Sequence, residues 1–179
     1  MDENNNANAD DQREYSRVET CIPLEYKIID VQQKQFVRAH LAGESILAEF
    51  KSLPNHDDQI INECFRTINA KLDEIIRMMT ISHEGFNCLN MTKVNISGGG
   101  ISFNTGKAFL PGDIIEIKVM LSMQKPSAFF LYGEVVELTK INSEYDTSIQ
   151  FIGIDDFVRD EVIRFVFETE REILREKRR

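Results

Sequence analysis

The sequence predicts a mainly β fold with helices, of the α+β class, and three observations carry this prediction. From Phe86 to about residue 153, short segments of alternating apolar and polar residues are separated by turn residues, as in an antiparallel barrel or sandwich. A stretch with helical periodicity occupies 31–84. Another helical segment closes the chain, from Asp155 or Asp156 to about Lys177.

Size and charge limit the classes of function. The chain has 179 residues, of which 42% are hydrophobic, enough for one ordinary domain with a real core. No apolar run approaches the roughly 18 residues of a membrane span, and the N-terminus lacks the regions of a signal peptide, so we expect a cytoplasmic protein. A formal net charge of −9 argues against a protein that coats nucleic acid or a membrane surface. An anionic ligand must therefore be held by local groups.

The N-terminal part is expected to be a disordered leader at 1–12 followed by a strand. The leader is almost entirely Asn, Asp, Ala and Glu, which bury no apolar surface. Arg13 and Arg17 directly precede the first apolar segment. Considered one at a time, each is best interpreted as an ordinary surface arginine. From Val18 to Ile29 apolar and polar positions mostly alternate, which predicts a half-buried strand, and Pro23 places it near a sheet edge or at a bulge.

The region 31–84 is predicted to form two helices. Apolar residues at helical spacing favour a first helix at about 31–52, which Pro54 ends. A second helix begins between Asn55 and Asp58 and ends at Gly85. Its apolar residues recur at alternating intervals of four and three, which is a heptad seam. The seam consists of Ile61, Phe65, Ile68, Leu72, Ile75 and Met79.

Two packing arrangements are open to this seam. Its partial pattern of Leu at a and Ile at d favours more than two strands, so we expect a homo-oligomer, with a tetramer favoured. Three heptads are short for a self-standing coiled coil, however, and the same stripe could pack on the 31–52 helix in an antiparallel hairpin.

Five more strands and a helix are expected in the second half. The strands lie near 86–95, 100–104, 113–121, 129–140 and 145–153, with turns at Pro111–Asp113 and Ile141–Ser143. The final helix should bury its first half against the β structure. Basic residues gather at its end, where the helix dipole favours cations.

The segment Asn95–Gly100 reads Asn-Ile-Ser-Gly-Gly-Gly and is poor material for a core. Asn95 and Ser97 fall on the same side of an extended strand. Gly98, Gly99 and Gly100 permit positive φ and let another group approach the main chain, so their N–H groups can face an anion. From these six residues alone, a glycine-rich hairpin turn is the better interpretation.

Five short motifs, taken in order along the chain, resemble the PilZ domain. They are Arg13-x-x-x-Arg17, Asn95-x-Ser97-x-x-Gly100, the turn Leu110-Pro-Gly112-Asp113, the strand Gly133-Glu-Val-Val, and Ile149-Gln-Phe151 before the last helix. The resemblance covers 13–30 and 86 to about 176. It implies a six-stranded antiparallel barrel, built from 13–30 and 85–179, in a bacterial cytoplasm. It also implies binding of the second messenger cyclic di-GMP.

Two features depart from the pattern that this resemblance implies. The helical region 31–84 is inserted between the two motifs, and helix-bearing members of the family are known to assemble as tetramers. Gln12 stands where many members have another arginine, and Asn95 stands where Asp is commoner, although Asn is an accepted alternative.

The chemistry of cyclic di-GMP agrees with these residues. A guanidinium group can bind a phosphate or the O6/N7 edge of guanine through two hydrogen bonds and can stack on a base, so Arg13 and Arg17 suit this ligand. Asn95 can address a guanine edge, and Ser97 with the Gly98–Gly100 backbone fits the ribose-phosphate ring. We expect 1–17, with Arg13 and Arg17, to be mobile without ligand, so ordering of this leader on binding is the expected output. Because Gln12 adds no cation, we expect one ligand per subunit.

Other classes of function compete with a receptor. An enzyme has little support, since the sequence has no nucleophile elbow, His-Glu metal motif or P-loop, and we expect no catalytic residue, metal or cofactor. The stronger alternative is a PilZ-like scaffold that binds no ligand and acts through its oligomerising helices. The intact arginines and the Asn-x-Ser-x-x-Gly segment argue against it. A receptor would signal to a downstream protein, and we expect no nucleic-acid or membrane partner.

Overall fold

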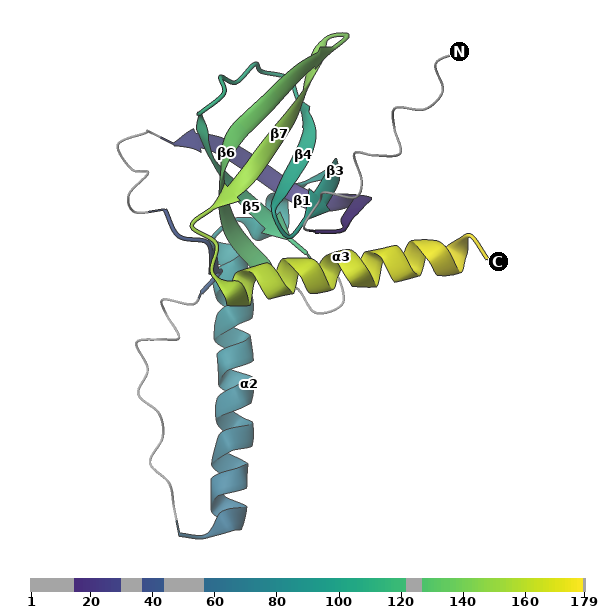
Figure 1. The fold of residues 1–179 in the computed structure, drawn as a ribbon. Helices are drawn as coiled ribbons and strands as arrows, with labels where there is room; N and C mark the ends of the chain where they lie inside the picture. Colours follow the sequence, from purple (N-terminus) through teal and green to yellow (C-terminus); the bar gives the residue numbers. More distant parts are fainter. Residues whose placement is uncertain (1–14, 30–36, 44–56, 122–126, 179) are drawn as a thin grey trace.

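The computed structural model describes residues 15–29, 37–43, 57–121 and 127–178 (Figure 1). The predicted leader at 1–12 and Arg13 lie outside these ranges. The elements follow one another as β1 (Arg17–Ile29), β2 (His40–Leu41), α2 (Gln59–His83), the short 3-10 helix η2 (Phe86–Cys88), β3 (Asn90–Ser97), β4 (Gly100–Thr105), β5 (Ile114–Met120), β6 (Ala128–Ile141), β7 (Glu144–Ile152) and α3 (Asp156–Glu176).

Six strands close an antiparallel barrel. Neighbours pair in the order β6, β5, β1, β3, β4 and β7, and β7 pairs with β6 to complete the circle. β1 changes partner at Leu24, pairing with β3 before this residue and with β5 after it. Pro23 therefore pairs with β3 on one side and has no β5 partner on the other. A strand position with one open side tolerates the N–H that proline lacks. The expected six-stranded barrel with a C-terminal helix is confirmed.

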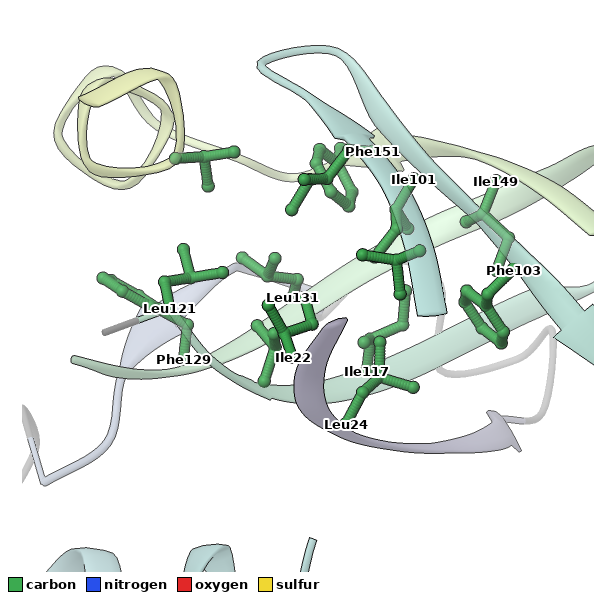
Figure 2. Packing of buried hydrophobic residues seen from close by; sticks show 14 of the residues in the cluster. Ile22, Leu24, Ile101, Phe103, Ile117, Leu121, Phe129, Leu131, Ile149 and Phe151 are labelled. Carbon is green, nitrogen blue, oxygen red and sulfur yellow. The ribbon is translucent and has the colours of Figure 1, made fainter. Parts of the chain in front are cut away.

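Apolar side chains from all six barrel strands fill the interior. Figure 2 shows Ile22, Ile117, Leu131 and Phe151 pointing toward one another between the strands. In β3, Val94 and Ile96 are at most 2% exposed, while Asn95 between them faces the other side of the sheet. This alternation places Asn95 and Ser97 on the outer face of the sheet, where Asn95 is half-buried and Ser97 is buried.

α3 packs its first half on the barrel, as the sequence predicts. Val158, Val162 and Val166, one helical turn apart, are buried against it. Asp155 caps the helix, and its carboxylate accepts a hydrogen bond from the Val158 N–H at 2.9 Å. The second half of α3 extends past the barrel (Figure 1).

The prediction of a helix at 31–52 is wrong for 37–43, the part that the structure describes. This segment lies along the barrel, where β2 pairs with β6 and His40 stands opposite Phe130. The Ala42 N–H donates to the Ala128 carbonyl at 2.8 Å, and Gly43 follows with a φ of 80°. Pairing with a sheet edge has overridden the helical spacing of these residues. Residues 30–36 and 44–56 lie outside the described ranges.

α2 begins and ends as predicted. The Asp58 side chain accepts hydrogen bonds from the N–H groups of Ile60 and Ile61, and Gly85 adopts the left-handed conformation, with a φ of 83°, after the last turn. Thr80 and Ile81 near its end are the buried residues of this helix. The strand predicted from residue 86 begins later, at Asn90, because Phe86–Cys88 form the 3-10 helix.

The rest of α2 projects away from the barrel (Figure 1). The six seam residues are between 37% and 68% exposed, so no described part of the chain covers the stripe. The described piece of the first predicted helix lies on the barrel, where it cannot cover the seam. Neither α2 nor α3 has the length and apolar character that crossing a membrane requires.

Candidate ligand site

The Asn95–Gly100 segment forms the β3–β4 hairpin. Ser97 pairs with Gly100 across a two-residue turn of Gly98 and Gly99. The Ser97 hydroxyl accepts a hydrogen bond from the Gly99 N–H and donates to the Gly100 carbonyl, both at 3.3 Å. The interpretation as a hairpin turn is therefore confirmed. None of the three glycines uses the positive φ that this residue type permits.

Other groups approach the main chain closely at Gly98 and Gly100, as the sequence predicts. A Cβ atom on Gly98 would lie 2.7 Å from Cγ1 of Ile163 and 2.8 Å from Cδ1 of Tyr15. A Cβ on Gly100 would lie 2.4 Å from the carbonyl oxygen of Ile149 in β7. The turn thus lies against α3 and against the chain that leads into β1, and there is no room for a larger residue.

A pocket of about 320 Å³ lies beside this hairpin. Its polar lining forms two rows across the strands. Arg17, Ser97, Gly100 and Gln150 are consecutive partners on β1, β3, β4 and β7. Asn95, Ser102 and Ser148 form the second row, on β3, β4 and β7.

Tyr15 and Val136 add an aromatic and an apolar side chain to the lining, which also includes Gly99, Ile101 and Ile149. Tyr15 lies at the β1 end of the pocket, and Val136 is the residue skipped where the β6–β7 register shifts between Val135 and Glu137. Such a bulge turns an additional side chain out of a strand, and Val136 is 51% exposed. The pocket therefore combines a cation, hydroxyl and amide groups, an aromatic ring and an apolar wall.

Arg17 and Asn95 have unused hydrogen-bonding capacity. Arg17 is exposed, and no hydrogen bond or ion pair joins its side chain to a residue in the described ranges. Asn95 Oδ1 is buried and accepts no hydrogen bond from those residues either. A buried amide oxygen without a donor costs about 1–3 kcal/mol. A ligand that brings a donor to Asn95 and an anion to Arg17 would satisfy both groups.

Tyr15 joins three parts of the molecule. Its ring lies against the Gly98–Gly99 turn, and the Arg159 guanidinium carbon of α3 is 5.7 Å from the ring centroid. This distance is typical of a cation–π contact. Arg159 also donates from Nη1 to the Gly98 carbonyl at 3.2 Å. The hairpin, the N-terminal part of α3 and the entry to β1 therefore meet at the pocket.

The same contacts correct one expectation about the leader. Arg17 was expected on the flexible part of the chain together with Arg13. Arg17 is instead the first residue of β1, paired with Ser97, and Tyr15 already packs on the hairpin.

The start of α3 is also tied to the insertion. Arg38 donates from Nη2 to Asp155 Oδ2 at 3.1 Å. The hydrogen bond from the Val158 N–H, together with Arg38, holds the pKa of Asp155 below its ordinary value of 3.8. The helix cap is therefore a charged carboxylate at neutral pH. A negative charge at this end also interacts favourably with the helix dipole.

Most residues predicted for ligand binding line this one pocket. Arg17, Asn95, Ser97, Gly99 and Gly100 are among them. Gly98 lies in the turn, with its carbonyl toward Arg159, and Arg13 lies outside the described residues. Among the residues that the structure describes, no cluster of three or more His, Cys, Asp and Glu side chains could hold a metal ion.

Sequence reasoning missed seven lining residues: Tyr15, Ile101, Ser102, Val136, Ser148, Ile149 and Gln150. Strand alternation could have placed Ser102 and Ser148 on the outer face with Asn95, but only if the pairing of β4 with β7 had been known. Nothing in the sequence indicates the bulge at Val136.

The model of the PilZ domain family matches residues 75–168. This range is more than half of the chain. The chain belongs to the PilZ domain family. The matched range begins within α2 and omits β1 with Arg17, although β1 is an integral strand of the barrel.

A solved structure shares the fold of this PilZ chain. It is a pathogenic protein from Xanthomonas campestris, described as a tetrameric PilZ domain self-assembled via an unusual helical bundle. The two chains are 16% identical with a TM-score of 0.57, and the match covers 90% of this chain and 91% of the other. A search of curated proteins gave no match.

Proposed function

We propose that this PilZ protein is a bacterial receptor for cyclic di-GMP and not an enzyme. The ligand-binding residues are Arg13, Arg17, Asn95, Ser97 and Gly98–Gly100. The observation that carries the proposal is the common pocket of Arg17 and the Asn95–Gly100 hairpin, which come from distant parts of the sequence. PilZ domains are ligand-binding regulatory domains, and the family membership supports the same role here.

Each group in the pocket has a distinct task with this ligand. Arg17 binds a phosphate or the O6/N7 edge of guanine, because its guanidinium has no competing partner among the described residues. Asn95 Oδ1 accepts a hydrogen bond from a donor on the guanine edge. The Ser97 hydroxyl already bonds to its own turn, so it holds the hairpin backbone in shape for the ribose-phosphate ring.

The proposed output has two parts. Arg13 and the leader before Tyr15 become ordered over the pocket when the ligand binds, since the phosphates supply the partner for Arg13. The α2 seam assembles chains into a homo-oligomer, with a tetramer favoured, and carries the signal to a downstream protein in the cytoplasm. The exposed seam and the tetrameric Xanthomonas structure support the assembly.

A scaffold that works through α2 without a ligand is the second candidate, and the exposed seam favours it as much as it favours an oligomeric receptor. Calorimetric titration of the purified protein with cyclic di-GMP, cyclic GMP-AMP and GTP distinguishes the two. A receptor should bind cyclic di-GMP at one ligand per chain. Arg17→Ala should weaken binding roughly thirtyfold, or about 2 kcal/mol, because a charge-assisted contact is lost.

Arg66→Ala is the matched control, since Arg66 is an exposed arginine on α2 outside this pocket. It should leave the affinity unchanged. Absence of any binding heat with the wild-type protein would overturn the receptor proposal and favour the scaffold. Saturation at two ligands per chain would overturn the stoichiometry alone.

A further inference from the structure

We propose that Glu19 is a specificity-determining residue that reads the donor edge of a guanine together with Asn95. This inference rests on the proposed function, because it concerns the ligand of the same site. It begins with a second groove, of about 530 Å³, which continues the outer face of β3 and β4. The groove shares Asn95 and Ser102 with the pocket and adds Glu19 to them.

The position of Glu19 follows from the strand register. Glu19 of β1 stands opposite Asn95, as Arg17 stands opposite Ser97. Opposed residues of an antiparallel pair have their Cβ atoms about 4.5–5.5 Å apart on the same face of the sheet. A carboxylate therefore stands beside the amide whose oxygen lacks a donor.

The chemistry of this pair fits guanine and rejects adenine. The Watson–Crick edge of guanine places two donors, N1–H and the 2-amino group, next to each other. A carboxylate accepts two parallel hydrogen bonds and donates none at neutral pH. Adenine has an acceptor at N1 and no 2-amino group, so it would leave the Glu19 carboxylate facing a lone pair.

Lys93 makes a carboxylate compatible with an anionic ligand. Its Nζ lies 3.2 Å from Glu19 Oε2, and both side chains are well exposed, at 73% and 66%. Such a surface ion pair contributes only about 0–1 kcal/mol, so Glu19 can leave it for a base without a large cost. The ammonium offsets the negative charge that would otherwise repel the phosphates.

The experiment compares cyclic di-GMP with cyclic di-IMP, whose hypoxanthine bases lack only the 2-amino group, on wild-type protein and Glu19→Gln. Wild type should prefer cyclic di-GMP by about tenfold or more, because a site built for a donor penalises its loss. Glu19→Gln should reduce this preference to less than about threefold, mainly by weaker binding of cyclic di-GMP.

If Glu19 does not contact the base, Glu19→Gln should give a different result. Removing a negative charge near a dianion would strengthen binding of both dinucleotides alike and leave their ratio unchanged, and this outcome would overturn the inference. Glu25→Gln is the matched control, since Glu25 is another exposed glutamate of β1 that lies near a lysine, Lys118, at 4.0 Å, and lines neither cavity. The ratio of the affinities of Glu25→Gln for cyclic di-GMP and cyclic di-IMP should equal that of wild type.

Lys93→Met provides an independent check. It should weaken both dinucleotides to the same extent while the preference for guanine persists, because it removes the positive charge and keeps the carboxylate. Loss of the preference in this variant would contradict the assignment to Glu19. If wild type binds neither dinucleotide, the proposed function itself fails, a result distinct from binding with an unchanged ratio.

Discussion

Arg159 of α3 donates a hydrogen bond to the Gly98 carbonyl at 3.2 Å, so the last helix holds the turn of the β3–β4 hairpin directly. The same guanidinium lies over the Tyr15 ring. Arg159 thus contacts both the turn of the hairpin and Tyr15, the residue that precedes β1 by two positions. The pocket is shaped by the helix as well as by the barrel.

Tyr15→Ala should weaken cyclic di-GMP binding roughly fivefold or more. Without the ring, the chain before β1 loses its contact with the turn, and the ligand must order it at about 1 kcal/mol per residue in backbone entropy. Calorimetry measures the effect, with exposed Ser16→Ala as the control in the same segment. Equal affinities for wild type and Tyr15→Ala would show that the contact of Tyr15 with the turn does not contribute to ligand binding.

Gly100→Ala should lower the stability of the fold by about 2–3 kcal/mol, because the new Cβ would overlap a backbone oxygen 2.4 Å away that cannot move without separating β4 from β7. For a chain of this length, the melting temperature should fall by roughly 5 °C or more. Gly106→Ala is the control, since its Cβ would meet nothing within 4 Å. Equal melting temperatures for the two variants would contradict this packing argument.

Local signals explain why much of the fold could be predicted. Asp58 and Gly85 mark the ends of α2 by hydrogen bonding and by backbone conformation within one turn of the helix. The alternation in β3 reports which side chains face the core. Such features depend on neighbours in sequence, so the sequence contains them.

The failures concern contacts between distant parts of the chain. Residues 37–43 have helical spacing but lie along β6, and no sequence pattern announces that pairing. The glycines of the hairpin were predicted to permit positive φ and a close approach to the main chain. Which groups approach Gly98 and Gly100, namely Ile163, Tyr15 and Ile149, depends on the completed fold. Tyr15 and Val136 reach the pocket through α3 packing and a bulge, which depend on the completed barrel.

Leu72→Asp should dissociate the proposed oligomer. The side chain lies mid-seam and is 51% exposed on the described chain, so burial between chains would be lost and a charge would enter the interface. Light scattering should give a wild-type mass near four times the 20.7 kDa of one chain, and a variant mass near one chain. Ala70→Asp adds the same charge to an exposed position on the opposite side of the heptad and should remain assembled. A monomeric wild type would refute the assembly.

Asp155→Asn should remove part of the acid sensitivity of the fold. The folded-state pKa of Asp155 is below 3.8, so its stabilising effect is present above that pH and is lost as the pH falls through the lowered value. The variant keeps a capping side chain but loses the charge. Its melting temperature should be lower than that of wild type at pH 7, and the difference should shrink toward pH 2.5.

Asp160→Asn, at an exposed position of α3, serves as the control for the pH series. At pH 7, the melting temperature of Asp160→Asn should differ less from that of wild type than the melting temperature of Asp155→Asn does. A gap between wild type and Asp155→Asn that stays constant from pH 7 to pH 2.5 would contradict the charged cap.

Hydrogen–deuterium exchange with and without cyclic di-GMP tests most directly whether the ligand occupies the pocket beside the β3–β4 hairpin. Among the described residues, the Gly99 N–H donates to the Ser97 hydroxyl at 3.3 Å, a long hydrogen bond, so its exchange should report a ligand that covers the turn. We predict slower exchange in peptides that contain 95–102 and in the segment before β1. Arg17→Ala should show much less of this protection at a ligand concentration close to the wild-type Kd, because it binds roughly thirtyfold more weakly. Unchanged exchange at 95–102 in saturating ligand, with protection elsewhere or nowhere, would contradict the account.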